Sequence, residues 1–197
     1  MSRLPLSTAI IERFNHALQT ARRAGEVEPT AMTLATSDGA GQISTRTVLL
    51  KALDADGFVF FTNLESNKGR QLLQNPRAAA TFFWKSTFCQ VQLQGDISQV
   101  SDDEADAYFA TRDRRSQLGA WASLQSQPLP SREFLLQRVA DFEQKFAGAE
   151  VPRPAYWSGF RLQPDMVEFW YGAEFRLHDR FRYNQVGGEW REQRLYP

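Results

Sequence analysis

The sequence predicts a mainly β protein, arranged as a small closed or split β-barrel with flanking helices. Short segments rich in β-branched and aromatic residues recur along the chain, separated by turn sequences. Only a few segments show the three- and four-residue spacing of an amphipathic helix. A chain of 197 residues can bury one substantial core, so we expect a single domain, 1–197. We expect an N-terminal helical segment at 1–27, followed at 28–197 by a barrel with helical insertions and C-terminal strands.

The first expected element is a helix, because apolar residues recur at helical spacing between positions 10 and 21. Ser7 is suited to cap its start and Gly25 to end it. Extended segments follow, and the first two flank the turn sequence SDGAGQ, a hairpin signal. We expect strands at 31–36, 44–53, 58–63, 78–84 and 89–100.

Helices are expected again where the alternating pattern stops. Ser66 stands at the start of a helix expected near 66–75, and Ser101 with Glu104 has capping-box spacing before a helix at 101–112. Residues 131–146 carry an amphipathic repeat. The last third returns to strands, at 158–164, 166–172, 175–184 and 189–195.

Composition excludes several classes of protein. The 23 basic and 23 acidic residues give no net charge, which argues against a general nucleic-acid binder. One cysteine allows no internal disulfide, and two distant histidines make a metal centre improbable. No signal peptide or membrane-spanning run is evident, so we expect a cytoplasmic protein without a membrane partner.

Phosphate-binding loops of the Rossmann and P-loop kinds are absent from the sequence, so any phosphate must be held by side chains from separate segments. The first candidate is RTVLLK, in which Arg46 and Lys51 bracket apolar residues and would point to opposite faces of a strand. The second is Lys68, which opposes the helix dipole unless an anion binds at the helix N-terminus. A strand with solvated ends and an exposed lysine are the alternatives.

The segment 108–126 concentrates further groups suited to phosphate oxygens. Tyr108 and Arg112 lie four residues apart, and Arg112, Arg114, Arg115 and Ser116 supply guanidinium groups and a hydroxyl. A solvated basic loop remains the alternative interpretation.

The sequence FRLHDRF, residues 175–181, raises a question about charge. On a strand, Arg176, His178 and Arg180 would share one face, and like charges at neighbouring positions repel. We therefore expect an anion in front of this strip, close to Trp170, while Asp179 on the other face can pair with an arginine. The alternative is that His178 is structural.

Taken in order, several motifs resemble the pyridoxine/pyridoxamine 5′-phosphate oxidase family. They are RTVLLK, FFTNLESNKG, QVQLQG, YFATR…SQLGAWAS…QS, VPRPAYWSGF, EFW and RLHDR, and the likeness runs from 28 to 197. The resemblance implies a homodimeric, FMN-binding split β-barrel, with FMN in clefts at the subunit interface.

Carried over by position, the resemblance implies site residues and a reaction. It implies FMN contacts at Arg46, Thr47, Val48, Leu49, Leu50, Lys51, Phe61, Thr62, Asn67, Lys68, Gln90, Gln125, Ser126, Trp170 and Arg180. It implies substrate contacts at Lys51, Tyr108, Arg112, Ser116, Arg176, Leu177 and His178, with Arg176 and His178 as the catalytic residues. The implied reaction oxidises pyridoxamine or pyridoxine 5′-phosphate to pyridoxal 5′-phosphate, with O2 reduced to H2O2 and no metal.

The sequence departs from the family pattern at several positions. Asn67 stands where an arginine is usual, which implies FMN binding roughly ten- to hundredfold weaker unless another group compensates. Thr47, Cys89 and Asp113 replace a usual Met, Arg and Pro. We expect the basic N-terminal segment that some relatives fold over the substrate to be represented here by Arg3 alone.

Two alternatives to this function stay open. One is a related flavoenzyme with another substrate, such as those of phenazine biosynthesis, although Lys51, Tyr108 and Arg112 together favour a phosphate-bearing substrate. The other is a non-catalytic protein that binds flavin or pyridoxal phosphate, for which Asn67 is the best argument.

Overall fold

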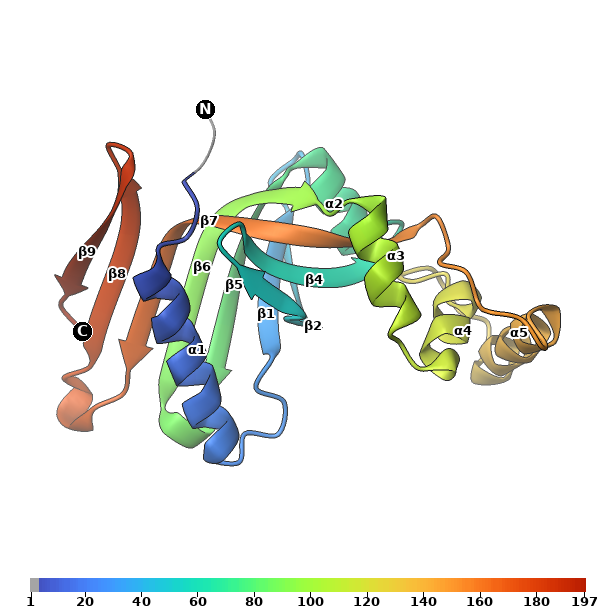
Figure 1. Ribbon diagram of the computed structural model, residues 1–197, viewed down its shortest axis with the longest axis horizontal. Coiled ribbons are helices and arrows are strands. Elements are labelled where there is room, and N and C mark those ends of the chain that lie inside the picture. The colour runs from blue at the N-terminus through green and yellow to red at the C-terminus, as the bar shows by residue number, and fades with distance from the viewer. Residues whose placement is uncertain (1–3) are drawn as a thin grey trace.

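The computed structural model describes residues 4–197, so Arg3 lies outside the described residues. In this part of the chain, five α-helices flank an antiparallel sheet (Figure 1). The helices are α1 (Thr8–Arg23), α2 (Asn67–Gln74), α3 (Asp102–Ala110), α4 (Arg114–Ala122) and α5 (Arg132–Lys145). The strands are β1 (Ala31–Ser37), β2 (Ile43–Leu49), β3 (Ala52–Asp54), β4 (Gly57–Asn63), β5 (Arg77–Trp84), β6 (Cys89–Gln99), β7 (Trp157–Tyr171), β8 (Asp179–Val186) and β9 (Glu189–Leu195).

The sheet is organised around β7, the longest strand. Its neighbours follow the order β2-β1-β5-β6-β7-β4-β3, and every pairing is antiparallel. The first part of β7 pairs with β4 and its last part with β8, which pairs in turn with β9. In Figure 1 the β8–β9 hairpin lies at one end of the molecule, and α3, α4 and α5 gather at the other. The sheet curls into a half-barrel, which confirms the prediction of a mainly β protein with flanking helices.

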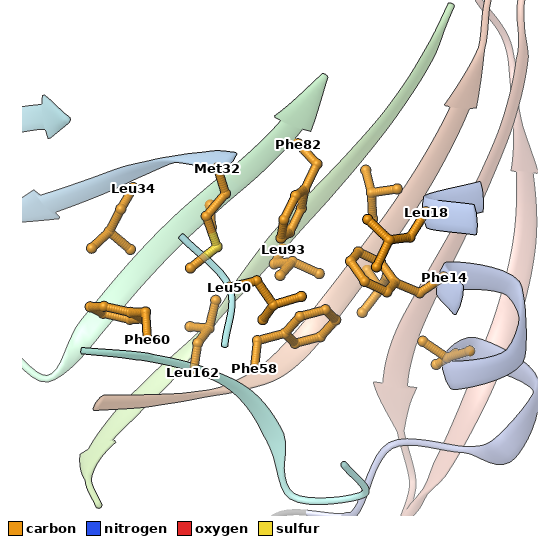
Figure 2. Packing of buried hydrophobic residues seen from close by; sticks show 14 of the residues in the cluster. Phe14, Leu18, Met32, Leu34, Leu50, Phe58, Phe60, Phe82, Leu93 and Leu162 are labelled. Atoms are coloured by element: carbon orange, nitrogen blue, oxygen red, sulfur yellow. The ribbon is translucent and has the colours of Figure 1, made fainter. Parts of the chain in front are cut away.

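The main core lies between α1 and the curled sheet (Figure 2). Phe14 of α1 is fully buried and meets Phe58 and Phe82 edge to face, at ring-centroid distances of 5.0 and 5.1 Å. Ser7 caps the helix as predicted, by accepting a hydrogen bond from the backbone N–H of Ile10. The expected N-terminal helix is therefore confirmed, and its apolar face covers the open side of the sheet.

Strand β7 differs from the sequence prediction, which divided it into 158–164 and 166–172. Pro164 lies within the strand, and the pairing with β6 shifts at Gln94 and Gly95, which accommodates the proline without ending the strand. A Cβ atom on Gly95 would lie 2.1 Å from the carbonyl oxygen of Gln163, so the close approach requires glycine. The long strand joins both ends of the molecule.

Two other predicted boundaries are wrong. The segment 44–53 is divided into β2 and β3, because the chain leaves the sheet ladder at Leu50 and Lys51. Helix α4 was not predicted as an element of its own, since a basic loop was only one interpretation of 108–126. Asp113 caps this helix by accepting a hydrogen bond from the backbone N–H of Ser116. Asp at the N-cap with a serine at N3 was the local signal for a helix start.

The predicted strand at 175–184 begins only at Asp179. Tyr171 of β7 pairs with Asp179 of β8, so residues 172–178 must connect two antiparallel strands. Phe175 and Arg176 have positive φ angles of 55° and 62° within a 3-10 turn, Glu174–Arg176. Arg176 and His178 therefore do not stand in a row with Arg180 on one strand. Within residues 4–197, the helices are too short or too polar to cross a bilayer.

Candidate anion-binding cavity

A cavity of about 1210 Å³ lies where the curled sheet meets the helices. Its wall is formed by β2, the end of β4, the first turn of α2, and the α3–α4 region. Single drug-sized ligands occupy pockets of about 300–1,000 Å³, so this cavity has room for more than one small molecule. Its cationic residues are Arg46, Lys51, Lys68 and Arg112.

Arg46 is held in the cavity wall by neutral oxygens. Its guanidinium donates to the hydroxyls of Thr36 and Ser44, the latter at 2.6 Å, and more weakly to Gln71 Oε1 at 3.4 Å. Thr36 and Ser44 also donate to Gln71 Oε1, at 2.6 and 2.9 Å. Burial lowers the pKa of Arg46. The arginine is thus oriented by three polar side chains that leave its charge uncompensated.

Lys68 lies in the first turn of α2 and is 9% exposed. Its Nζ donates to Gln125 Oε1 at 3.0 Å, Thr62 Oγ1 at 3.1 Å and Ser66 Oγ at 3.2 Å. Burial, and after it the nearby charge of Arg46, together lower the pKa of Lys68 to about 8. Three neutral acceptors therefore hold a buried ammonium group that favours a bound anion.

Arg112 contacts aromatic rings that form another part of the cavity wall. Its guanidinium carbon lies 4.8 Å from the ring centroid of Trp157, and its NH1 is buried without a hydrogen-bond partner. Burial lowers the pKa of Arg112. Phe61 stacks on Tyr108 and on Trp157, at ring-centroid distances of 4.0 and 5.3 Å, with nearly parallel rings. This wall presents flat apolar surface beside an unsatisfied cation.

The cavity cations differ from several other arginines of the described chain that pair with carboxylates. Within residues 4–197, Arg46, Lys68 and Arg112 form no ion pair with a carboxylate. Several arginines outside the cavity do so: Arg77 with Asp96 and Asp165, Arg153 with Asp102 and Asp106, Arg161 with Asp54 and Glu104, and Arg182 with Glu168. Buried charges are normally paired, so the contrast indicates that this cavity receives anions from outside the chain.

Most of the residues expected at the site line this one cavity. They are Arg46, Thr47, Val48, Leu49, Lys51, Phe61, Thr62, Asn67, Lys68, Tyr108, Arg112, Ser116, Gln125 and Ser126. Leu50 does not, because it is 7% exposed and packs in the main core. Arg46 and Lys51 were expected on opposite faces of one strand, yet both line the cavity, since β2 ends at Leu49.

A second group of expected site residues lies at the far end of β7. Gln90, Trp170 and Arg180 pair side by side across β6, β7 and β8. Trp157 borders the cavity and Trp170 follows thirteen residues later in the same strand, a strand path of about 40 Å. Six expected site residues lie at this end and do not line the cavity: Gln90, Trp170, Arg176, Leu177, His178 and Arg180.

Arg180 is not the unpaired cation that the sequence suggested. Its guanidinium pairs with Glu168 at 2.8 Å, and Glu168, 1% exposed, also binds Arg182. His178 packs on Trp170 with ring centroids 4.6 Å apart, and its Nδ1 accepts a hydrogen bond from the backbone N–H of Ala173. In the neutral ring this leaves Nε2 as the protonated nitrogen. The ring is therefore oriented within the connection between β7 and β8.

Several residues of the site were not found from the sequence. Ser44 and Arg46 share a strand face, and Gln71 lies one helical turn after Lys68, so periodicity could have linked them. Glu168 interrupts an apolar run, a signal of a buried ion pair. Nothing local distinguishes Trp157, which enters the cavity only because β7 begins there.

Comparisons with known proteins agree with this geometry. Residues 18–146 match the family described as pyridoxamine 5′-phosphate oxidase, and residues 157–197 match the pyridoxine 5′-phosphate oxidase C-terminal dimerisation region. A pyridoxine/pyridoxamine 5′-phosphate oxidase of Myxococcus xanthus is 54% identical over 187 residues, which are 95% of this chain and 91% of that protein. One of Xylella fastidiosa is 50% identical over 200 residues, covering 100% of this chain and 96% of that protein.

Solved structures show the same fold. PhzG from Burkholderia lata, in complex with tetrahydrophenazine-1-carboxylic acid, gives a TM-score of 0.90 at 33% identity, covering 95% of this chain and 92% of its own. A pyridoxamine 5′-phosphate oxidase-related, FMN binding protein from Nostoc punctiforme gives 0.73 at 18% identity, over 100% of both chains. The chain therefore belongs to the pyridoxamine 5′-phosphate oxidase family of oxidoreductases, with its split-barrel fold.

Proposed function

We propose that this protein is an FMN-dependent oxidase that converts pyridoxamine 5′-phosphate and pyridoxine 5′-phosphate to pyridoxal 5′-phosphate. The observation that carries the proposal is one large cavity lined by two groups of cations that form no ion pair with a carboxylate within residues 4–197. Two phosphorylated aromatic molecules would supply the missing negative charge, and the parallel rings of Phe61 and Trp157 offer them flat apolar contacts. The names of the curated relatives support this substrate class.

The group at Arg46 and Lys68 fits the phosphate of FMN. Both side chains are oriented by neutral acceptors, and Ser66 caps the N-terminus of α2, a natural site for phosphate. Gln125 and Ser126 approach the same helix, since the hydroxyl of Ser126 accepts a hydrogen bond from the backbone N–H of Asn67 at 3.2 Å. When bound, FMN would supply the redox chemistry, by accepting two electrons from the C4′ carbon of the substrate and passing them to O2, which becomes H2O2. With the amine substrate, water would enter and ammonia would leave.

The group at Tyr108, Arg112 and Ser116 fits the phosphate of the substrate. The NH1 group of Arg112 is a buried donor without an acceptor, which a phosphate oxygen could provide. The ring of Trp157 packs against the guanidinium group. Lys51 is exposed on the same cavity and can neutralise either ligand. These residues bind and orient the substrate and exclude water from one side of it, which is the main contribution a protein makes to flavin chemistry.

We infer that the working unit is a homodimer in which each cavity is completed by the far end of the partner's β7. Within one chain, Arg176 and His178 stand too far from the cavity to reach its ligands. Apolar side chains at that end are exposed, with Phe175 at 88%, Leu177 at 68% and Phe88 at 59%. Exposed apolar patches of this kind mark interaction surfaces, and residues 157–197 match a dimerisation region.

Anaerobic reduction tests the proposed reaction. The purified protein should carry flavin absorbance, and pyridoxine 5′-phosphate or pyridoxamine 5′-phosphate should bleach it under nitrogen. Readmitted O2 should restore the colour with one H2O2 formed per pyridoxal 5′-phosphate. A colourless protein that takes up no FMN, or a yellow one that neither substrate reduces, would contradict the proposal.

We propose that Arg176 and His178 position and polarise the substituent on the reacting carbon of the substrate. Arg176→Ala and His178→Ala should then slow flavin reduction in stopped-flow measurements while the flavin stays bound. The outcome that counts against this role is loss of the flavin from both purified variants.

The similarity to PhzG favours a second candidate, a flavoenzyme that acts on a carboxylated aromatic substrate. Arg112 with Tyr108 and Lys51 supports the phosphate-bearing substrate instead, because three polar groups converge beside an apolar wall. Reduction of the flavin by pyridoxine 5′-phosphate and not by pyridoxine would separate the two candidates. Flavin that stays oxidised with every substrate would point to a non-catalytic binding protein.

A further inference from the structure

Asp113 lies in the cavity wall beside Arg112, where it adds the one carboxylate among the described residues that line the cavity. It precedes α4 and accepts two hydrogen bonds from Ser116. Oδ1 takes the backbone N–H at 2.9 Å, and Oδ2 takes the side-chain hydroxyl at 2.6 Å. These hydrogen bonds and the neighbouring Arg112 lower the pKa of Asp113, so the carboxylate is charged at neutral pH.

Capping of α4 does not by itself account for a charged residue at this position. Asparagine caps a helix as well as aspartate, because one side-chain oxygen suffices for the backbone N–H. The second oxygen of Asp113 therefore has a separate effect, which is to occupy the hydroxyl proton of Ser116. A serine hydroxyl has one proton to donate, so Ser116 turns only lone pairs toward other ligands while this bond lasts.

A phosphate bound at Arg112 would meet two obstacles. Ser116 can donate to it only by giving up the bond to Asp113, and the carboxylate repels a phosphate dianion at short range. Arg112 itself is partly compensated by the same charge. The phosphate subsite is thus weaker than its residue types suggest.

We propose that Asp113 is a specificity-determining residue that weakens phosphate binding at Arg112 by withholding the hydroxyl of Ser116 and repelling the ligand. The inference deepens the proposed function, since it concerns the subsite for the substrate phosphate. It means that this chain binds that phosphate more weakly, so a phosphorylated product is released faster.

The test is a calorimetric titration with inorganic phosphate of three proteins: the natural chain, Asp113→Asn and Glu143→Gln. Asp113→Asn keeps the cap but turns Oδ2 into an NH2 group that cannot accept, so the Ser116 hydroxyl is freed. Glu143 lies exposed on α5 away from the cavity, so its variant removes the same charge without touching the site. Phosphate bound at Arg46 and Lys68 is common to all three proteins and cancels in the comparison.

Asp113→Asn should bind phosphate roughly tenfold more tightly, the gain expected from one hydrogen bond to a charged acceptor and the loss of a repulsion. Glu143→Gln should match the natural chain. In steady-state kinetics, KM for pyridoxine 5′-phosphate should fall by a similar factor in Asp113→Asn, with kcat equal or lower. Equal phosphate affinity in Asp113→Asn and the natural chain would overturn the inference.

A double-mutant cycle with Ser116→Ala separates the withheld hydroxyl from simple repulsion. The loss of phosphate affinity on Ser116→Ala should be several-fold larger in the Asp113→Asn background than in the natural chain. Equal losses in both backgrounds would show that Asp113 does not occupy the hydroxyl. Neither titration requires turnover. If both give the expected result but pyridoxine 5′-phosphate never reduces the flavin, the proposed function is refuted and the inference about Asp113 is not.

Discussion

At the scale of single residues, the cavity depends on polar side chains that hold cations without neutralising them. Arg46 and Lys68 donate hydrogen bonds to hydroxyl and amide oxygens, whereas Arg153 and Arg161, outside the cavity, bind carboxylates. A neutral acceptor fixes the orientation of the cationic side chain without cancelling its charge. The full positive charge therefore acts on an incoming phosphate. The arrangement is costly without a ligand, because buried cations lose hydration.

The protonation of Lys68 should make FMN binding pH-dependent. Its pKa of about 8 in the free protein means that the ammonium loses its proton as pH rises through 8. A phosphate favours the charged form, so binding takes up protons and the affinity should fall between pH 7 and 9.5. Flavin fluorescence quenching measures the dissociation constant across this range.

The controls for this pH dependence are two lysine variants. Lys68→Gln should bind FMN more weakly at pH 7 and show a flat profile above it. Lys85→Gln, at an exposed lysine outside the cavity, should keep the natural profile. A natural chain with the same affinity at pH 7 and 9.5 would argue against the lowered pKa.

Gln71 should act as a positioning residue for Arg46. Gln71→Ala removes the acceptor shared by Thr36, Ser44 and Arg46 and should weaken FMN binding by about three- to tenfold, the value of one net hydrogen bond. Gln71→Glu should weaken it more, because a carboxylate there neutralises the arginine. Gln74→Glu adds the same charge one turn later on an exposed position and serves as the control. Equal affinities of the two glutamate variants would contradict the role.

At the scale of elements, the position of Lys68 depends on how closely α2 packs against the chain that precedes it. Ser66 caps the helix, and its hydroxyl also donates to the carbonyl of Asn63 at 2.7 Å, which folds the connection under the first turn. A Cβ atom on Gly69 would lie 2.2 Å from the carbonyl oxygen of Leu64. Only glycine lets the helix start at this depth, with the ammonium group of Lys68 inside the cavity.

Gly69→Ala and Gly119→Ala should change stability in opposite directions. The first forces α2 away from backbone atoms and should lower the free energy of unfolding by about 1–3 kcal/mol. The second adds a methyl group where nothing lies within 4 Å, in the interior of α4, and should raise it by about 0.5–1 kcal/mol. Urea denaturation of both variants measures the two values. A stabilised Gly69→Ala would show that α2 can shift freely.

At the scale of the whole molecule, α1 closes the open side of the half-barrel. Phe14 is buried against Phe58 of β4 and Phe82 of β5 (Figure 2). It also contacts Trp84 of β5. Phe14→Ala should lower the free energy of unfolding by about 3–5 kcal/mol, because the cavity it leaves lies between rigid layers. Phe134→Ala, at a side chain 49% exposed on α5, should cost less than about 1 kcal/mol. Thermal and urea unfolding of both variants would test this; similar losses would show that α1 is not part of the core.

The proposed dimer predicts complementation between two inactive variants. Arg112→Ala damages the cavity, and His178→Ala damages the far end of β7 that serves the partner's cavity. Unfolding and refolding an equal mixture should yield mixed dimers in which one of two sites is intact, restoring about a quarter of the natural activity. Each variant refolded alone is the control. A mixture no more active than its components would mean that each chain builds its own site.

The sequence by itself determined the local elements and the chemical groups. Helix caps at Ser7, Ser66 and Ser101 act within four residues, so they could be predicted from spacing alone and are confirmed. The family motifs also identified most of the cavity-lining residues, including Arg46, Lys68 and Arg112.

Only the tertiary structure decided which of these groups meet. Lys68 and Gln125 are 57 residues apart in sequence, yet they share a hydrogen bond because α2 and the α4 connection close on one cavity. Arg176 and His178 do not lie on the strand predicted for them, because the register of β7 with β8 makes 172–178 a connection between the two strands. Long-range register and curvature arise from pairings between distant strands, which no local pattern contains.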